Sequence, residues 1–252
     1  PERLEELAPH IRDCEIAAVC VSARPRDEAD SYMPVFHAGD AQGRGLAAML
    51  GVPCFSTTHQ RGHIAAAKVD SGVVDGDLLA VHLSGGTTEL LLVEPDGKNV
   101  KCTKIGGTSD ISAGQLIDRT GQLLQLPFPS GKYLDVLSKE AVMRDVFKVK
   151  CNNMEFSLSG VQNKVQQFHA QNGIPAETAS YALRCVAKAV YLATEQALKA
   201  YPGLPVVFSG GVASNSLLRE VIAPLNPVFA QPQFSTDNAM GTAVLAYRIT
   251  EE

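Results

Sequence analysis

The sequence has no run of lysine or arginine, no Cys-x-x-Cys pair and no apolar stretch long enough to span a bilayer. With a net charge of −5, composition does not indicate a nucleic-acid binder, although a local basic patch is compatible with it. The six cysteines are scattered, and no secretory signal precedes them. We therefore expect reduced thiols, a cytoplasmic location and no membrane partner.

The chain has 252 residues, of which 45% are hydrophobic and 19% charged, enough for one large domain or two lobes with cores of their own. Strand and helix patterns alternate, so the predicted class is α/β. Asp110 is placed to cap the N-terminus of a helix over 111–124. Strands are expected at 16–21, 52–55, 78–83, 88–93, 205–208 and 227–230. Helices are expected at 59–69, 111–124, 175–200, 213–221 and 236–247, and 46–50 is expected to be the end of another short helix.

Two histidines, His59 and His63, stand four residues apart directly after an apolar stretch. On a helix this spacing places both imidazoles on one face, which is the beginning of a metal site. Two helix-surface histidines without a ligand would give the same pattern. A carboxylate near the end of the chain, Asp237, is a candidate third ligand, because two histidines and one carboxylate form a facial set with open positions. Asp237 is also placed to cap the last helix.

A glycine-containing segment joins the apolar runs 78–83 and 88–93 and predicts a hairpin. It consists of Ser84, Gly85, Gly86, Thr87 and Thr88. Its backbone N–H groups and hydroxyls suit a phosphate, although an ordinary tight turn has the same composition. A second Ser-Gly-Gly, with Gly210 and Gly211, also follows an apolar run and opens a helix, where an anion or nucleotide is favoured. The repeat predicts two related lobes that face a shared cleft, with the two Ser-Gly-Gly segments facing each other across the cleft that holds the metal.

Three further polar residues are candidates for binding a nucleotide. Asp118 and Asp135 flank the turn that ends in Gly131, where carboxylates can accept hydrogen bonds from ribose hydroxyls. Solvated surface acids would fit the same pattern. Asn215 can bond a base or ribose, or simply cap the helix that follows it.

These pieces occur in one order along nearly the whole chain. The motifs are Thr58-His59-x-x-Gly62-His63, Leu83-Ser-Gly-Gly-Thr-Thr-Glu89, Ala113-Gly114-x-x-Ile-Asp118, Leu126-Pro-x-Pro-Ser-Gly131-x-x-x-Asp135, Phe156-Ser-Leu-Ser-Gly160, Ser209-Gly-Gly-Val-Ala-Ser-Asn215 and Thr236-Asp-Asn238. In this order they resemble the TsaD/Kae1/Qri7 family, also classified as glycoproteases of peptidase family M22. Together they are far more specific than any single motif.

The resemblance implies an actin-like ATPase fold of two related lobes around a cleft. We expect residues 1–105 to form the N-terminal lobe and 106–252 the C-terminal lobe, with the last helix packing back near the cleft. The implied activity is transfer of a threonylcarbamoyl group from its adenylate to N6 of adenosine 37 in tRNA.

The resemblance also implies the ligands. His59, His63 and Asp237 correspond to the family's ligands for one iron or zinc ion. The Ser-Gly-Gly hairpin corresponds to the segment that faces the substrate's carbamoyl and phosphate groups. Asp118, Gly131, Asp135 and Asn215 correspond to residues that bind an adenine nucleotide or threonylcarbamoyl-AMP.

Some family features are missing from this sequence. No N-terminal strand with the first phosphate motif precedes residue 16, the family's Gly-Pro-Gly loop is replaced near Arg26, and Thr87 stands where the family has histidine. An alternative is therefore a non-catalytic paralog that binds nucleotide or a partner as a scaffold. A metalloendopeptidase is less favoured, because no glutamate follows His59. We expect a homodimer or a sister family protein to contact the N-terminal lobe, because an unpaired sheet edge recruits another chain.

Overall fold

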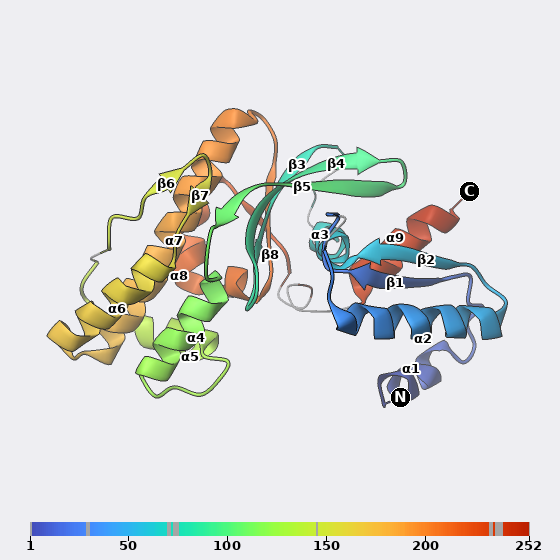
Figure 1. Ribbon diagram of the computed structural model, residues 1–252, viewed down its shortest axis with the longest axis horizontal. Helices are drawn as coiled ribbons and strands as arrows, with labels where there is room; N and C mark the ends of the chain where they lie inside the picture. The colour runs from blue at the N-terminus through green and yellow to red at the C-terminus, as the bar shows by residue number, and fades with distance from the viewer. Residues whose placement is uncertain are drawn as a thin grey trace.

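The computed structural model describes residues 2–28, 31–69, 72, 76–144, 146–231, 234 and 239–251. A seven-stranded mixed sheet forms the middle of the molecule, in the order β6-β7-β5-β4-β3-β8-β9 (Figure 1). Its strands are β3 (Leu78–Leu83), β4 (Thr88–Asp96), β5 (Asn99–Thr108), β6 (Cys151–Asn152), β7 (Glu155–Phe156), β8 (Val206–Ser209) and β9 (Val228–Phe229). A separate parallel pair consists of β1 (Val19–Arg24) and β2 (Cys54–Thr58).

Helices cover both ends of this arrangement (Figure 1). The strand pair packs with α2 (Pro34–Leu50), α3 (His59–Lys68) and α9 (Met240–Thr250), while α1 (Glu2–Ile11) lies beyond α2. The other end of the molecule holds α4 (Ala113–Leu123), α5 (Gly131–Ser138), α6 (Ser159–Asn172), α7 (Pro175–Ala200) and α8 (Ser216–Ile222), with the short 3-10 helices η1 (Gly211–Ser214) and η2 (Ala223–Leu225). Because α9 packs on α3, the end of the chain returns to its first third.

The sheet separates two apolar cores. On one face, α7 packs its alanine-rich stripe with α4, α6 and α8, and Phe208 of β8 is fully buried there. On the other face, Ile64 and Ala67 of α3 pack on Leu78 and Leu91. The predicted lobe boundary at 105–106 stays a prediction, and β5 continues across it.

Several predicted elements are confirmed. β3 and β4 form the expected antiparallel hairpin, with the backbone N–H of Ser84 donating to the carbonyl of Thr87 at 2.8 Å. The long helix has the predicted bounds Pro175–Ala200. By contrast, α2 is much longer than the predicted segment 46–50. The predicted start of the last helix at 236 lies outside the described residues, and α9 begins at Met240.

The predicted cap of the helix after β5 is wrong. Ser112, not Asp110, is the N-cap of α4, and it forms a capping box with Gln115. The carboxylate of Asp110 instead accepts hydrogen bonds from the backbone N–H groups of Leu158 and Ser159, at the start of α6. Asp110 therefore caps a helix that begins some fifty residues later in the chain.

No helix within the described part of the chain is long and apolar enough to cross a membrane. All six cysteines are free thiols.

Candidate functional site

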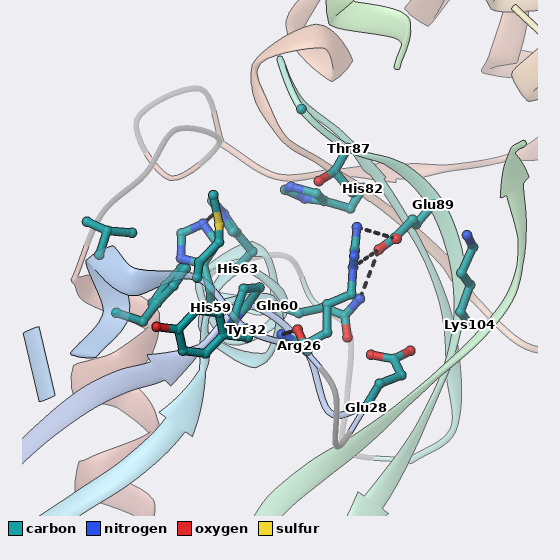
Figure 2. Close-up of a pocket in the computed structure, with 16 residues that line it drawn as sticks. Arg26, Glu28, Tyr32, His59, Gln60, His63, His82, Thr87, Glu89 and Lys104 are labelled. Carbon is teal, nitrogen blue, oxygen red and sulfur yellow. Dashed lines mark hydrogen bonds and ion pairs between the residues drawn. The ribbon is translucent and has the colours of Figure 1, made fainter. Parts of the chain in front are cut away.

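The two histidines of the first motif lie on α3 and face a cavity of about 770 Å³, here called the histidine cavity. The helix begins directly after β2, and the side chain of Thr58 caps it by accepting from the backbone N–H of Arg61 at 3.2 Å. His59 is therefore in the first turn, and His63 is one turn later on the same face. Their Nε2 atoms are 3.1 Å apart. Figure 2 shows the two rings meeting at one side of the cavity.

This separation fits a shared divalent cation. Two imidazole nitrogens, each about 2.0–2.1 Å from one ion, lie about 3.0–3.4 Å apart. Asp237, the predicted third ligand, lies outside the described residues. Within the described residues, no three His, Cys, Asp or Glu side chains form a metal-binding group. The metal set therefore stays a prediction, with two of its members brought together.

A third imidazole, which the sequence analysis did not single out, reaches into the same cavity. His82 belongs to β3, a strand whose other residues are apolar, and its ring centre is 4.5 Å from that of His63. Its Nδ1 is 2.9 Å from Oγ of Ser209. Burial, followed by the neighbouring charges of His63 and His59, lowers the pKa of His82 to about 3, so the ring is neutral at physiological pH. A lone histidine in an apolar strand was the available sequence signal.

A buried carboxylate closes another wall of the histidine cavity. Glu89 is 5% exposed, and its oxygens lie 2.6 and 3.1 Å from the guanidinium of Arg26. Gln60 donates to the same carboxylate at 3.1 Å (Figure 2). The pair joins the loop after β1 to the β3–β4 hairpin, so it fixes the two sides of the cavity. The sequence alone did not indicate this contact, because its partners are more than sixty residues apart.

A second cavity, of about 440 Å³, lies beside the turn that joins β3 and β4 and is here called the nucleotide cavity. Six of the residues predicted to bind nucleotide or phosphate line it: Gly85, Asp118, Gly131, Asp135, Gly211 and Asn215. Gly86 and Thr87 instead line the histidine cavity. Adjacent residues of one turn therefore line the two cavities.

The carboxylates and the amide of the nucleotide cavity are held by backbone groups. Asp118 Oδ1 accepts from the N–H of Ser130 at 2.9 Å, and Asp135 Oδ1 accepts from the N–H of Ser216 at 2.9 Å. Asn215 caps α8 through Oδ1, while its buried Nδ2 has no hydrogen-bond partner among the described residues. Asn215 thus caps a helix, as one alternative predicted, and its Nδ2 donor is still available to a ligand.

The remaining residues of the two Ser-Gly-Gly segments fix the turn. Ser84 Oγ accepts from the N–H of Thr87 at 3.1 Å, and Thr88 Oγ1 accepts from the N–H of Ala113 at 2.8 Å, at the start of α4. Gly210 has φ +90°, and a Cβ there would lie 2.2 Å from the carbonyl oxygen of Leu83. Only glycine fits this approach without strain.

The relation between the two Ser-Gly-Gly segments differs from the expectation. They do not face each other across the cleft of the histidines. β3 and β8 are adjacent parallel strands with His82 opposite Ser209, so both segments leave the same edge of one sheet side by side. Gly85 and Gly211 consequently share the nucleotide cavity.

Comparison with solved structures identifies the fold. Full-length HypF in its phosphate- and nucleotide-bound form superposes with a TM-score of 0.74 at 13% identity, over 100% of this chain and 41% of that one. HypF of T. kodakarensis gives 0.72 at 14% identity, over 99% and 43%. The activator of 2-hydroxyisocaproyl-CoA dehydratase from Clostridium difficile, with bound ADPNP, gives 0.55 at 14%, over 99% and 81%. The chain has the α/β, actin-like ATPase fold.

Sequence comparison identifies the family. The profile of TsaD, described as tRNA N6-adenosine threonylcarbamoyltransferase, matches residues 32–244. Proteins of that name are 30% identical in Carboxydothermus hydrogenoformans, over 92% of this chain and 71% of the relative, and 32% identical in Streptococcus suis, over 73% and 56%. The relative from Kosmotoga olearia is 33% identical, over 81% and 64%. The chain spans between about half and three quarters of these relatives, and it belongs to the TsaD family of tRNA-modifying transferases.

Proposed function

We propose that this chain transfers a threonylcarbamoyl, or carbamoyl, group from an adenylate to N6 of adenosine 37 in tRNA. The observation that carries the proposal is the turn shared by the two cavities, with Gly85 in one and Gly86 in the other. An adenylate seated in the nucleotide cavity would extend its acyl end past this turn toward the histidines. Membership of the TsaD family supports the same substrate class.

The nucleotide cavity supports an adenine nucleotide. Two carboxylates held by backbone N–H groups offer acceptors for ribose hydroxyls, and their geometry is fixed before a ligand arrives. The unpartnered Nδ2 of Asn215, a residue only 8% exposed, is a buried donor that a ligand oxygen or ring nitrogen would satisfy. Leaving such a donor unpaired costs about 1–3 kcal/mol, which a bound nucleotide would recover.

The histidine cavity supports one divalent metal, iron or zinc. His59 and His63 would hold it, with Asp237 as the proposed third ligand. When bound, such an ion supplies Lewis-acid stabilisation of charge that develops on a carbonyl oxygen. The surrounding chain positions the acceptor, and the Arg26–Glu89 pair keeps the cavity walls together.

The reaction balances without a protein nucleophile. The N6 nitrogen of adenosine forms a bond to the carbamoyl carbon, the bond from that carbon to the phosphate oxygen breaks, and AMP leaves with the electron pair. The attacking amine loses one proton to solvent or to the departing phosphate. What the chain contributes is the alignment of donor and acceptor, and such positioning accounts for a large part of many enzymatic accelerations.

The direct test is incubation of the metal-loaded chain with threonylcarbamoyl-AMP and unmodified tRNA. Digestion and mass spectrometry should detect N6-threonylcarbamoyladenosine, and Asp118→Ala should reduce its rate of formation through weaker nucleotide binding. A matched surface control is Asp96→Ala, whose carboxylate is mostly exposed and lines neither cavity. Absence of product with metal, donor and tRNA all present would contradict the proposal.

Exposed apolar side chains on α1 and α2 favour a second role, as a partner-binding member of the family. Leu7 is 47% exposed, Val35 66% and Met49 88%. We therefore retain the prediction that a homodimer or a sister family protein contacts this end of the chain. Light scattering at several concentrations tests it: a strict monomer with full transfer activity would exclude both the partner and the scaffold role.

A further inference from the structure

His82 is a buried polar residue of the histidine cavity that belongs neither to the predicted metal ligands nor to the predicted nucleotide-binding residues. It is 8% exposed in a strand whose neighbouring residues are apolar and fully packed. Burying an imidazole there costs free energy unless its nitrogens find partners. One nitrogen has such a partner in Ser209, and the residue lines the histidine cavity.

The bond with Ser209 selects the tautomer of the ring. The hydroxyl of Ser209, which is 2% exposed, has Nδ1 of His82 as its hydrogen-bond partner among the described residues. A buried hydroxyl hydrogen needs an acceptor, so Ser209 donates to Nδ1. Because Nδ1 accepts this hydrogen bond, the proton of the ring is on Nε2, where it is a donor.

The ring is also well placed to meet a ligand. Figure 2 shows His82 extending from β3 toward His63, and Thr87 lines the same cavity. Thr87 and Gly86 belong to the turn that separates the two cavities. An acyl group that passes this turn from the nucleotide cavity would therefore enter the cavity that His82 lines together with the histidine pair.

We propose that Nε2–H of His82 donates a hydrogen bond to the carbonyl oxygen of the carbamoyl group during its transfer. This inference rests on the proposed function, and it makes His82 a substrate-contacting residue. A fixed donor aimed at an oxygen that gains negative charge stabilises the transition state more than the ground state. Ser209 has a positioning role, because its hydroxyl holds the ring in the tautomer that donates.

Two substitutions separate the contact from a purely structural role. His82→Gln keeps an amide N–H near the position of Nε2, whereas His82→Asn keeps a polar group only near Nδ1, where it can still bond Ser209. We expect His82→Asn to lower the transfer rate about 100-fold, the typical loss on removing one such donor. His82→Gln should retain at least tenfold more activity than His82→Asn. If packing alone mattered, the shorter Asn that keeps the Ser209 bond would be equal or better.

A binding measurement makes the test independent of turnover. Calorimetry with AMP and with a non-hydrolysable threonylcarbamoyl-AMP analogue should show equal AMP affinity in wild type and both variants. The analogue should bind His82→Asn more weakly than His82→Gln. Equal analogue affinity in the two variants, or Asn-variant activity at or above that of the Gln variant, would overturn the role of His82. A wild-type chain that binds the analogue but transfers nothing would overturn the proposed function, and the order of analogue affinities would still decide the contact.

Discussion

The histidine cavity and the nucleotide cavity meet at one turn, yet they are made of different groups. The histidine cavity is walled by side chains: three imidazoles, and a carboxylate paired with a guanidinium. The nucleotide cavity is walled largely by glycines and by carboxylates that backbone N–H groups hold in place. The histidine cavity thus offers side-chain groups that can bind a metal or polarise a substrate, whereas glycines leave room in the nucleotide cavity for a ligand to approach the backbone.

This difference indicates which kind of substitution should abolish ligand binding in each cavity. Removing one imidazole deletes a functional group and leaves the backbone intact. Adding a single methyl group to Gly114, which packs against the shared turn, would displace that turn and so change the shape of both cavities at once. Substitutions of the two kinds should therefore separate the cavities experimentally.

The largest effect is expected from His63→Ala, which would separate metal binding from nucleotide binding. Loss of a direct ligand should lower metal affinity by more than about 100-fold, since even indirect partners of a ligand contribute 10–100-fold. Metal analysis of the purified variant should show almost no bound ion, while AMP affinity stays unchanged. His10→Ala, on exposed α1, is the matched histidine control. A full complement of metal in His63→Ala would remove this residue from the site.

Gly114→Ala should disturb both cavities together. A Cβ at residue 114 would lie 2.5 Å from the carbonyl oxygen of Ser84 and from Cα of Gly85, so α4 and the turn must move apart. We expect a loss of about 1–3 kcal/mol in the free energy of unfolding, measured in urea. AMP and metal affinity should both fall. Gly86→Ala is the control, because nothing lies within 4 Å of its added methyl; equal stability of the two variants would contradict the packing argument.

Asn215→Asp tests the nucleotide cavity alone. The substitution keeps an oxygen to cap α8 through the N–H of Leu218 but removes the buried Nδ2 donor. Affinity for AMP should fall at least about tenfold, equivalent to about 1.4 kcal/mol, through loss of the donor and repulsion of the phosphate, and burial of the new carboxylate should also lower the unfolding free energy. Asn215→Ala should lose both the affinity and about 1 kcal/mol of helix capping. Unchanged AMP binding in both variants would exclude Asn215 from the nucleotide site.

The smallest effect is expected at Asp110, outside both cavities. Partial burial opposes ionisation, but hydrogen bonds from Ser157 and Ser159 prevail and lower its pKa to about 2. The ionised form therefore stabilises the fold above the ordinary carboxyl pKa, and this contribution disappears as pH falls from about 4 to 2. Asp110→Asn should cost about 1 kcal/mol at neutral pH. In urea titrations the difference from wild type should shrink below pH 4; a constant difference would contradict the assignment.

The sequence predicts local features of the molecule well. The hairpin 78–93 and the helix Pro175–Ala200 follow from short-range patterns, since two apolar runs joined by a glycine-containing turn, and a proline in the first turn of a helix, need no distant partner. The sequence predicts only a short helix that ends at 46–50, whereas α2 spans Pro34–Leu50. Gly43 is needed for packing: a Cβ there would lie 2.2 Å from the side chain of Val21. That requirement comes from β1, which local propensity does not include.

Parts of the candidate site depend on partners that sequence distance hides. Asp110 stands next to one helix but caps another, because the end of β5 lies beside the start of α6. In the sequence, His82 is one polar residue in an apolar strand, and its partner Ser209 becomes apparent only from the parallel register of β3 and β8. The motif residues of the nucleotide cavity were identified by their order along the chain, and their assembly around one cavity depends on the pairing of β3 with β8.

The contact between α3 and α9 has a consequence for the order in which the molecule is made. Gly241 of α9 packs so closely against α3, the helix that carries both histidines, that a Cβ at this position would clash with the carbonyl oxygen of Gly62. Lys98, in the β4–β5 hairpin, donates to the carbonyls of Ile249 and Glu251 at the end of α9. Chains begin to fold from the N-terminus during synthesis. All described residues that line the nucleotide cavity precede α9 in the sequence, so they are synthesised first. The nucleotide cavity can therefore assemble before α9 packs against α3, the helix that carries His59 and His63. A ribosome-bound chain would thus acquire the shape of its nucleotide cavity before the helix of its histidine cavity is held in place.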